Sequence, residues 1–291
     1  VEIDRTKLKR AYADLVVSDR MLDQIGPAII AQSSIFMYGP SGNGKTSLAE
    51  RMLRVYDDTV LIPYAVEVDS QIVSLFDPVV HHPVENQDEN MDQRWIRCKR
   101  PFVVVGGELA PSMLELRLDE GSGVYAAPLQ MKANNGILVI DDFGRQLMSP
   151  RDLLNRWIVP LDRRVDYLTL RYGVKFQIPF QLMVVFSTNL DPADLADEAF
   201  LRRIQNKIYV EAVSPAVFDQ IFERVVAARR VPAESDSAEY LRKLCLREGR
   251  TELRACYPND ICNILESISR YEGRNISMSK PDLERATSLY F

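Results

Sequence analysis

Residues 39–46 read GPSGNGKT and have the types and spacing needed to bind a phosphate group. Two glycines five residues apart precede a lysine and a threonine, which gives the pattern G-x-x-x-x-G-K-[ST]. Such a loop points its backbone N–H groups at phosphate oxygens, and the helix that follows adds the positive end of its dipole. We expect Lys45 to reach the β- and γ-phosphates of a nucleotide and the Thr46 hydroxyl to bind Mg²⁺. The predicted nucleotide-binding residues of the loop are Gly39, Pro40, Ser41, Gly42, Asn43, Gly44, Lys45, Thr46 and Ser47.

The residues on either side of this loop predict the strand and the helix that must hold it. The run Ser34–Tyr38 is apolar, as in a buried strand, and Ser47–Val55 has helical spacing. Phosphate binding requires a strand that ends in the loop and a helix that begins near Lys45. The sequence therefore predicts a nucleotide site, the alternative being a glycine-rich turn that binds nothing.

A second motif, GILVIDDFGR at residues 136–145, places two acids directly after an apolar run. The four residues Ile137–Ile140 are typical of a parallel strand that is covered on both faces. We predict that Asp141 holds the Mg²⁺ shell and that Asp142 polarises an attacking water. In the alternative interpretation, both acids only cap the next turn.

A third apolar run, FQLMVVFSTN, begins at Phe180 and ends in the polar amide of Asn189. At the tip of a neighbouring strand, this amide would touch the γ-phosphate or the water beside it. Farther along, Arg202 and Arg203 precede another apolar run at residues 207–210. From residue 214 the chain has helical periodicity and no further strand pattern.

The composition indicates a globular chain with a large core. It has 291 residues, 46% of them apolar, and a net charge of −5. No apolar run approaches the roughly 20 residues of a membrane helix, and the first ten residues are charged rather than signal-like. We therefore expect a cytoplasmic protein without membrane insertion. The acidic balance gives no overall electrostatic footprint for nucleic acid.

The cysteines and histidines do not have the spacing of a metal site. None of the four cysteines forms a C-x-x-C pair, and the two histidines, His81 and His82, are adjacent. We expect reduced thiols in the core and no structural zinc. The polar stretch His81–Trp95 is predicted to be a mobile, solvated loop or a contact for a partner. The cysteines are Cys98, Cys245, Cys256 and Cys262.

The order of the motifs, from the phosphate loop through hydrophobic-D-D, S-T-N and L-R-R to a helical tail, resembles that of AAA+ ATPases. The resemblance covers essentially the whole chain. It implies an α/β fold, with a P-loop NTPase core in which helices sandwich a parallel sheet at residues 1–213, and a small all-α lid domain at residues 214–291. It also implies ATP and Mg²⁺ as cofactors, ATP hydrolysis, and a homo-oligomer in the form of a hexameric ring.

The resemblance also assigns roles to single residues. Asn189 takes the place of the family's sensor 1. The arginines after AFL resemble the arginine finger that enters a neighbouring subunit's site, with Arg203 the first candidate and Arg202 the second. The alternative for this pair is a surface salt bridge. Sensor 2 is normally an arginine, but CYPNDI puts Asn259 in its place in the nucleotide site, and Arg254 is the cation that would substitute.

Two inserts narrow the resemblance within the family. The stretch between Lys45 and Asp141 is longer than the roughly 60 residues that two strand–helix units take. Residues 116–136 are broken by glycines and resemble the helix-two insert hairpin of MoxR-like proteins and bacterial enhancer-binding activators. In residues 163–181, polar and apolar residues alternate on both sides of a turn at residues 172–173. This pattern predicts a hairpin, which resembles the pre-sensor-1 hairpin of that branch. The activators' GAFTGA motif is absent, so the MoxR-like side fits better.

These features predict an ATP-driven ring protein that remodels or assembles a protein client. The family's catalytic acid is normally glutamate, and Asp142 is one methylene shorter, which predicts slower hydrolysis. Asp142 and Asn259 together favour an alternative function, a nucleotide-gated scaffold that hydrolyses little ATP. A DNA-remodelling ATPase is a further alternative, in which Arg97, Lys99 and Arg100 would line the pore of the ring.

Overall fold

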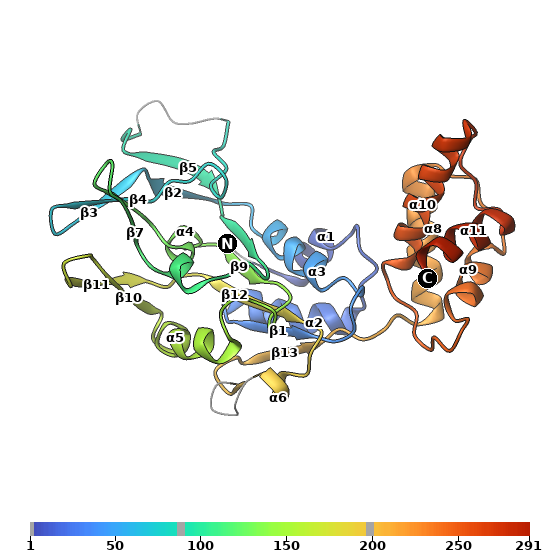
Figure 1. Cartoon of the computed structure of the whole chain (residues 1–291), viewed down its shortest axis with the longest axis horizontal. Helices are drawn as coiled ribbons and strands as arrows, with labels where there is room; N and C mark the ends of the chain where they lie inside the picture. Colours follow the sequence, from blue (N-terminus) through green and yellow to red (C-terminus); the bar gives the residue numbers. More distant parts are fainter. Residues whose placement is uncertain (1–2, 86–90, 196–200) are drawn as a thin grey trace. The chain divides into compact units, whose positions relative to one another are not determined.

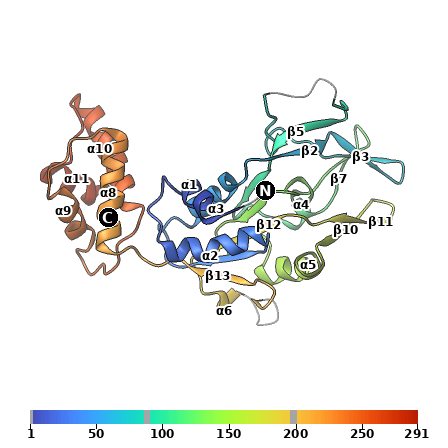
Figure 2. The same cartoon turned by 180° about the vertical axis from the view of Figure 1, so that it is seen from behind.

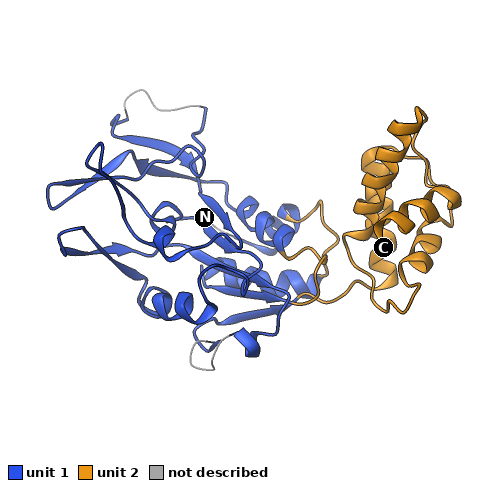
Figure 3. Ribbon diagram, in the orientation of Figure 1, with its two compact units in different colours: residues 1–11, 19–38, 46–209 blue, residues 12–18, 39–45, 210–291 orange. Residues whose placement is uncertain are grey.

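The computed structural model describes residues 3–85, 91–195 and 201–291, and the chain divides into two compact units (Figure 3). Unit 1 comprises residues 1–11, 19–38 and 46–209, and unit 2 comprises residues 12–18, 39–45 and 210–291. Most of the phosphate loop is thus part of unit 2, together with the helical C-terminal region. A domain boundary between residues 213 and 214 stays a prediction.

A five-stranded parallel sheet forms the centre of unit 1 (Figure 1). The strand order is β13-β1-β12-β9-β6, and each neighbouring pair is parallel. The predicted strands before the phosphate loop and before the two acids are confirmed. The strands are β1 (Ile35–Tyr38), β6 (Phe102–Val105), β9 (Ile137–Ile140), β12 (Met183–Thr188) and β13 (Asn206–Tyr209).

Helices cover this sheet, and its side chains alternate between its two faces. Phe36, Ile140 and Phe186 share one face and pack in a single core with Trp157 of α5. By the same alternation, Asp141 points to the opposite face. Figure 2 shows α2 beside β13, which it contacts. The helices of this part are α1 (Arg5–Ala11), α2 (Asp19–Ile30), α3 (Lys45–Met52) and α5 (Pro150–Arg163).

Smaller sheets and short helices extend unit 1 beyond the parallel sheet (Figure 1). The hairpin predicted around residues 172–173 is confirmed, because β10 (Val165–Thr169) and β11 (Lys175–Pro179) pair antiparallel. The glycine-broken stretch 116–136 contains a second antiparallel pair, β7 and β8, and helix α4. The remaining elements are β2 (Thr59–Pro63), β3 (Ala65–Val68), β4 (Gln71–Ser74), β5 (Trp95–Lys99), β7 (Arg117–Asp119), β8 (Val124–Ala126), α4 (Leu129–Lys132), α6 (Pro192–Leu195) and the 3-10 helices η1 (Leu53–Val55) and η2 (Pro111–Leu114).

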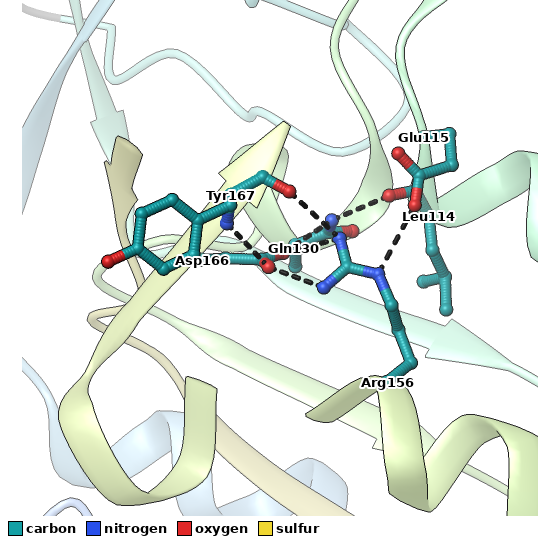
Figure 4. Close-up of polar contacts among 6 residues, drawn as sticks. All are labelled: Leu114, Glu115, Gln130, Arg156, Asp166 and Tyr167. Atoms are coloured by element: carbon teal, nitrogen blue, oxygen red, sulfur yellow. Dashed lines mark hydrogen bonds and ion pairs between the residues drawn. The ribbon is translucent and has the colours of Figure 1, made fainter. Parts of the chain in front are cut away.

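An ion pair between the half-buried Arg156 and the buried Asp166 attaches the β10–β11 hairpin to α5 (Figure 4). Arg156 on α5 donates from Nη1 to Asp166 Oδ1 at 2.5 Å and from Nη2 to Oδ2 at 3.1 Å. Gln130 of α4 donates to the same carboxylate at 3.1 Å and to the Leu114 carbonyl at 2.8 Å. Arg156 also donates to Glu115 at 3.2 Å. The hairpin, the end of η2 and α4 are therefore joined to one helix through Arg156 and the two carboxylates that it binds.

The C-terminal part of unit 2 is helical, as the periodicity from residue 214 predicts. Ser214 caps the first of these helices by accepting a hydrogen bond from the Val217 N–H at 3.3 Å. Phe218, Leu241 and Leu283 are fully buried in the shared core. With the parallel sheet of unit 1, this region confirms the predicted α/β fold class. The helices are α8 (Pro215–Arg229), α9 (Ser237–Cys245), α10 (Tyr257–Glu272) and α11 (Lys280–Tyr290).

The polar stretch 81–95 is not solvated throughout. His81 is completely buried, and its Nδ1 accepts from the Asp77 N–H at 3.0 Å while Nε2 lies 2.8 Å from the Lys132 carbonyl oxygen. The prediction of a solvated loop is therefore wrong for this residue. Residues 86–90 of the stretch lie outside the described residues. Within the described ranges, no helix is long and apolar enough to cross a membrane.

Candidate functional site

The phosphate-loop motif forms the turn between β1 and α3, as predicted. β1 ends at Tyr38 and α3 begins at Lys45. The loop's three glycines have positive φ angles of 135°, 79° and 84°, so the backbone curls in a way that other residues rarely adopt. Lys45 Nζ folds back over the loop and donates to the carbonyl oxygens of Gly39 at 2.8 Å and Pro40 at 3.0 Å. The loop has the conformation and the cation that phosphate binding needs.

The segment 254–256, within unit 2, lies directly against this loop. The Cys256 N–H donates to the Gly42 carbonyl at 2.9 Å, and the Ala255 N–H donates to Asn43 Oδ1 at 3.2 Å. A Cβ added to Gly42 would lie 2.7 Å from Cys256 Sγ and 3.3 Å from Arg254 Cδ. Burial raises the pKa of the Cys256 thiol, so it adds no negative charge beside the loop near neutral pH. Arg254 thus lies at the loop.

The Thr46 hydroxyl and the first acid of the second motif meet in unit 1, although they are 95 residues apart. Thr46 Oγ1 donates to Asp141 Oδ2 at 2.7 Å. The other carboxylate oxygen, Oδ1, accepts from the Asp142 N–H at 3.0 Å. A hydroxyl and a carboxylate are hard oxygen ligands of the kind that Mg²⁺ prefers. The pair that the sequence predicts as metal ligands therefore fits a magnesium ion.

A glutamine that the sequence analysis did not single out braces the turn with the two acids. Gln146 Nε2 donates to the carbonyl oxygens of Asp141 at 2.9 Å and Asp142 at 3.2 Å, and its Oε1 accepts from the Gly144 N–H at 2.8 Å. Asp142 is exposed, and its φ of 48° is in the left-handed region. The three bonds hold this backbone in place. No pattern in the sequence distinguishes a glutamine at this distance from an ordinary polar residue.

The end of β12 is attached to the same turn. Thr188 Oγ1 donates to the Phe143 carbonyl at 2.7 Å, and the Phe143 N–H donates to the Ser187 carbonyl at 2.7 Å. Asn189 follows directly and is exposed. The structure thus brings the strand end that carries Asn189 to the turn that follows Asp141, as the shared edge of a parallel sheet requires.

The predicted arginines and Asn259 have other partners in the chain. Arg203 Nε donates to Asp162 Oδ2 of α5 at 2.9 Å, which is the salt bridge that the sequence left as an alternative, whereas Arg202 is exposed. Asn259 lies in the first turn of α10 and accepts from Arg229 Nη2 at 2.6 Å. The finger and sensor roles of these residues stay predictions.

Comparison with solved structures finds the same fold in two AAA+ ATPases. A point mutant of RuvB from Thermotoga maritima superimposes with a TM-score of 0.53 at 10% identity, over 99% of this chain and 71% of that one. NtrX from Brucella abortus superimposes with a TM-score of 0.57 at 16% identity, over 98% of this chain and 59% of that one. NtrX in complex with ATP gives a TM-score of 0.54 at 16% identity, over 98% and 61%. The chain thus has the fold of these ATPases and spans only about three fifths of NtrX.

Comparison of the sequence itself is less informative. A family model described as a domain of unknown function (DUF8689) matches residues 214–289, which is most of the helical region. No curated protein matches the sequence. Function must therefore be argued from the site.

Proposed function

We propose that this protein is an AAA+ ATPase that assembles into a ring and uses ATP to remodel or assemble a protein client. The observation that carries the proposal is the 2.7 Å hydrogen bond between Thr46 and Asp141. It joins the phosphate-loop motif to the acid of a second motif, and both residues have the chemistry of magnesium ligands. The neighbours of similar fold support the proposal, since one of them, NtrX, has been solved with ATP and with ADP.

The loop and its lysine would bind the phosphates. Its N–H groups and the N-terminus of α3 would face the phosphate oxygens, and Lys45 would exchange its two carbonyl acceptors for the β- and γ-phosphates. Thr46 and Asp141 would hold Mg²⁺, which supplies positive charge that polarises the γ-phosphate. Asp142 would orient and deprotonate the attacking water, with its backbone fixed by Gln146.

Arg254 is the better candidate for the cation that responds to nucleotide. It lies against Gly42 of the loop, whereas the Asn259 side chain is engaged with Arg229. An arginine carries the positive charge that pairs with phosphate oxygens, and an asparagine does not. We therefore propose Arg254, on the segment before α10, as the substitute for sensor 2.

The proposed ring requires an arginine that contacts the nucleotide bound by a neighbouring subunit. Arg203 would have to leave Asp162 to do so, whereas Arg202 is already exposed. Either variant, Arg203→Ala or Arg202→Ala, tests the role when it is mixed with Asp142→Asn subunits. A true finger variant recovers ATPase activity on mixing, because some interfaces then pair an intact Asp142 with an intact arginine. A surface arginine shows no such recovery.

A protein client is favoured over DNA. Arg100, one of the cations that would line a pore for DNA, donates at 2.6 Å to each carboxylate oxygen of Asp58 and stacks on Tyr56. Its charge is neutralised within the chain, so it has little to offer a phosphate backbone. The β10–β11 hairpin and the β7–β8 pair would instead transmit motion to the client.

The test of the proposed function is ATP binding and hydrolysis by three variants. Lys45→Ala should lose ATP binding, and Asp142→Asn should bind ATP without turning it over. Lys243→Ala, which removes an exposed lysine on α9, is the matched control and should behave as wild type. Micromolar ATP affinity retained by Lys45→Ala would refute the site. A wild type that binds ATP and oligomerises without hydrolysis would favour the scaffold alternative.

A further inference from the structure

Ser187 has a buried hydroxyl whose hydrogen-bonding capacity is unused. Only 1% of the residue is exposed, and its Oγ has no hydrogen-bond partner in the part of the chain that the structure describes. The adjacent Thr188 hydroxyl, by contrast, donates to the Phe143 carbonyl at 2.7 Å. An unsatisfied buried hydroxyl is unfavourable and uncommon, so its presence calls for a partner that arrives with a ligand.

The register of the sheet places this hydroxyl beside the predicted metal ligand. Phe186 on β12 pairs with Ile140, the last residue of β9, so Ser187 comes level with Asp141, the first residue after that strand. Phe186 and Ile140 share the face toward α5, and alternation therefore puts Ser187 and Asp141 together on the opposite face. Adjacent strands lie about 4.8 Å apart. The register therefore predicts that the hydroxyl and the carboxylate are neighbours.

The surroundings of Asp141 decide what the hydroxyl can bind. Both carboxylate oxygens already accept hydrogen bonds, from the Asp142 N–H and from Thr46 Oγ1. A serine hydroxyl can donate one hydrogen bond and accept others. Mg²⁺ in proteins keeps several water ligands, because it loses its hydration shell reluctantly. A water of that shell is a partner that Ser187 could bind without displacing a bond that the structure already has.

We propose that Ser187 Oγ hydrogen-bonds a water ligand of the Mg²⁺ held by Thr46 and Asp141, and so strengthens metal binding when nucleotide is present. The inference rests on the proposed nucleotide site and adds a residue from a second strand to it. Ser187 is a positioning residue, since it acts through the water and not on the reacting atoms. Loss of this hydroxyl should therefore change the Mg²⁺ concentration that nucleotide binding requires.

The experiment measures binding and not turnover. A fluorescent ADP analogue is bound to wild type and to Ser187→Ala, and free Mg²⁺ is varied with EDTA. Ser187→Ala should need about three- to tenfold more Mg²⁺ for half of the metal-dependent gain in ADP affinity, the effect of one hydrogen bond. Its affinity for ADP in excess EDTA should be unchanged. Ser34→Ala makes the same truncation at a buried serine that precedes β1, and should alter neither value.

Thermal unfolding without nucleotide separates this role from a structural one. Ser187→Ala should unfold no earlier than wild type, because it removes a hydroxyl that has no partner. A lower unfolding midpoint, or a Mg²⁺ requirement within twofold of wild type, would overturn the inference and leave the nucleotide site standing. A wild-type protein that binds no ADP would overturn both.

Discussion

The ion pair between Arg156 and Asp166 gives a prediction that does not depend on the proposed function. Asp166 is 1% exposed, and among the described residues two donors remain to its carboxylate, Gln130 Nε2 and the Tyr167 N–H, when Arg156→Met removes the guanidinium. Removing one partner of a buried pair costs about 3–5 kcal/mol, because the remaining charge stays desolvated. The two surviving donors place the expected loss of unfolding free energy near the lower end, at about 3 kcal/mol.

Urea unfolding followed by Trp157 fluorescence measures this loss. The Trp157 ring is fully buried next to Arg156 in the core of unit 1, and Trp95→Phe in every variant removes the other tryptophan. Arg171→Met is the matched control. It breaks the pair with Glu120, in which the two side chains are 58% and 78% exposed, and should cost less than about 1 kcal/mol.

A second variant tests the reason and not only the size of the effect. Replacing both partners, as Arg156→Met with Asp166→Leu, removes the stranded charge and should recover most of the lost free energy. A single variant within about 1 kcal/mol of its background would refute the reasoning, since Asp166 would then be solvated. A double variant as unstable as the single one would show that the loss of stability comes from the missing side-chain contacts and not from an unpaired buried charge.

Three further predictions follow from the site and its surroundings. Gln146→Ala should lower kcat for ATP about tenfold or more, with KM within about threefold, because it removes the hydrogen bonds that hold the strained backbone of Asp142. In the same steady-state kinetics, Gln146→Glu keeps only the acceptor for Gly144 and should show an equal or larger loss. Gly42→Ala should lower ADP affinity at least tenfold in a fluorescence titration, since its Cβ would lie 2.7 Å from Cys256 Sγ; unchanged affinity would mean that the loop binds without this contact. Burial lowers the pKa of His81 below 6.5, so at lower pH the unfolded chain takes up a proton that the folded chain does not, and the free energy of unfolding should fall as pH drops from 7 through 6.5 toward 5. His81→Gln should remove that part of the fall in urea unfolding measured across this pH range. Identical pH profiles for the variant and wild type would count against the prediction.

The parts of the site that the sequence predicts well are those set by parallel-strand geometry. Strands buried on both faces have apolar sequences, so the sequence predicts β9 at its observed bounds, Ile137–Ile140. Because parallel strands present their carboxyl ends at one edge, the motif acid was expected near the phosphate loop, and Thr46 and Asp141 do meet. These contacts follow from local pattern plus topology.

The parts that the sequence does not reveal are contacts between side chains of unrelated segments. Gln146 follows no periodicity, and the ion pair of Arg203 with Asp162 spans 41 positions with no pattern to signal it. The burial of His81 was missed because adjacent histidines before a charged run resemble a surface loop, whereas the carbonyl of Lys132, 51 positions away, supplies the partner. Such contacts depend on tertiary packing, and a single sequence does not encode them in its spacing.

Helix α5 carries the ion pair of Asp162 with Arg203 and also that of Arg156 with Asp166, so it connects two segments that are separate in the sequence. Arg156 and Asp162 lie six positions apart on the helix, which is about 9 Å along its axis, and they point to different sides of it. One engages the β10–β11 hairpin, and the other engages Arg203. Trp157 anchors the helix in the core, but Pro160 lies between the two positions and removes one hydrogen bond of the helical backbone, so a pull that releases Arg203 from Asp162 would reach the hairpin through a helix that is weakened at this point.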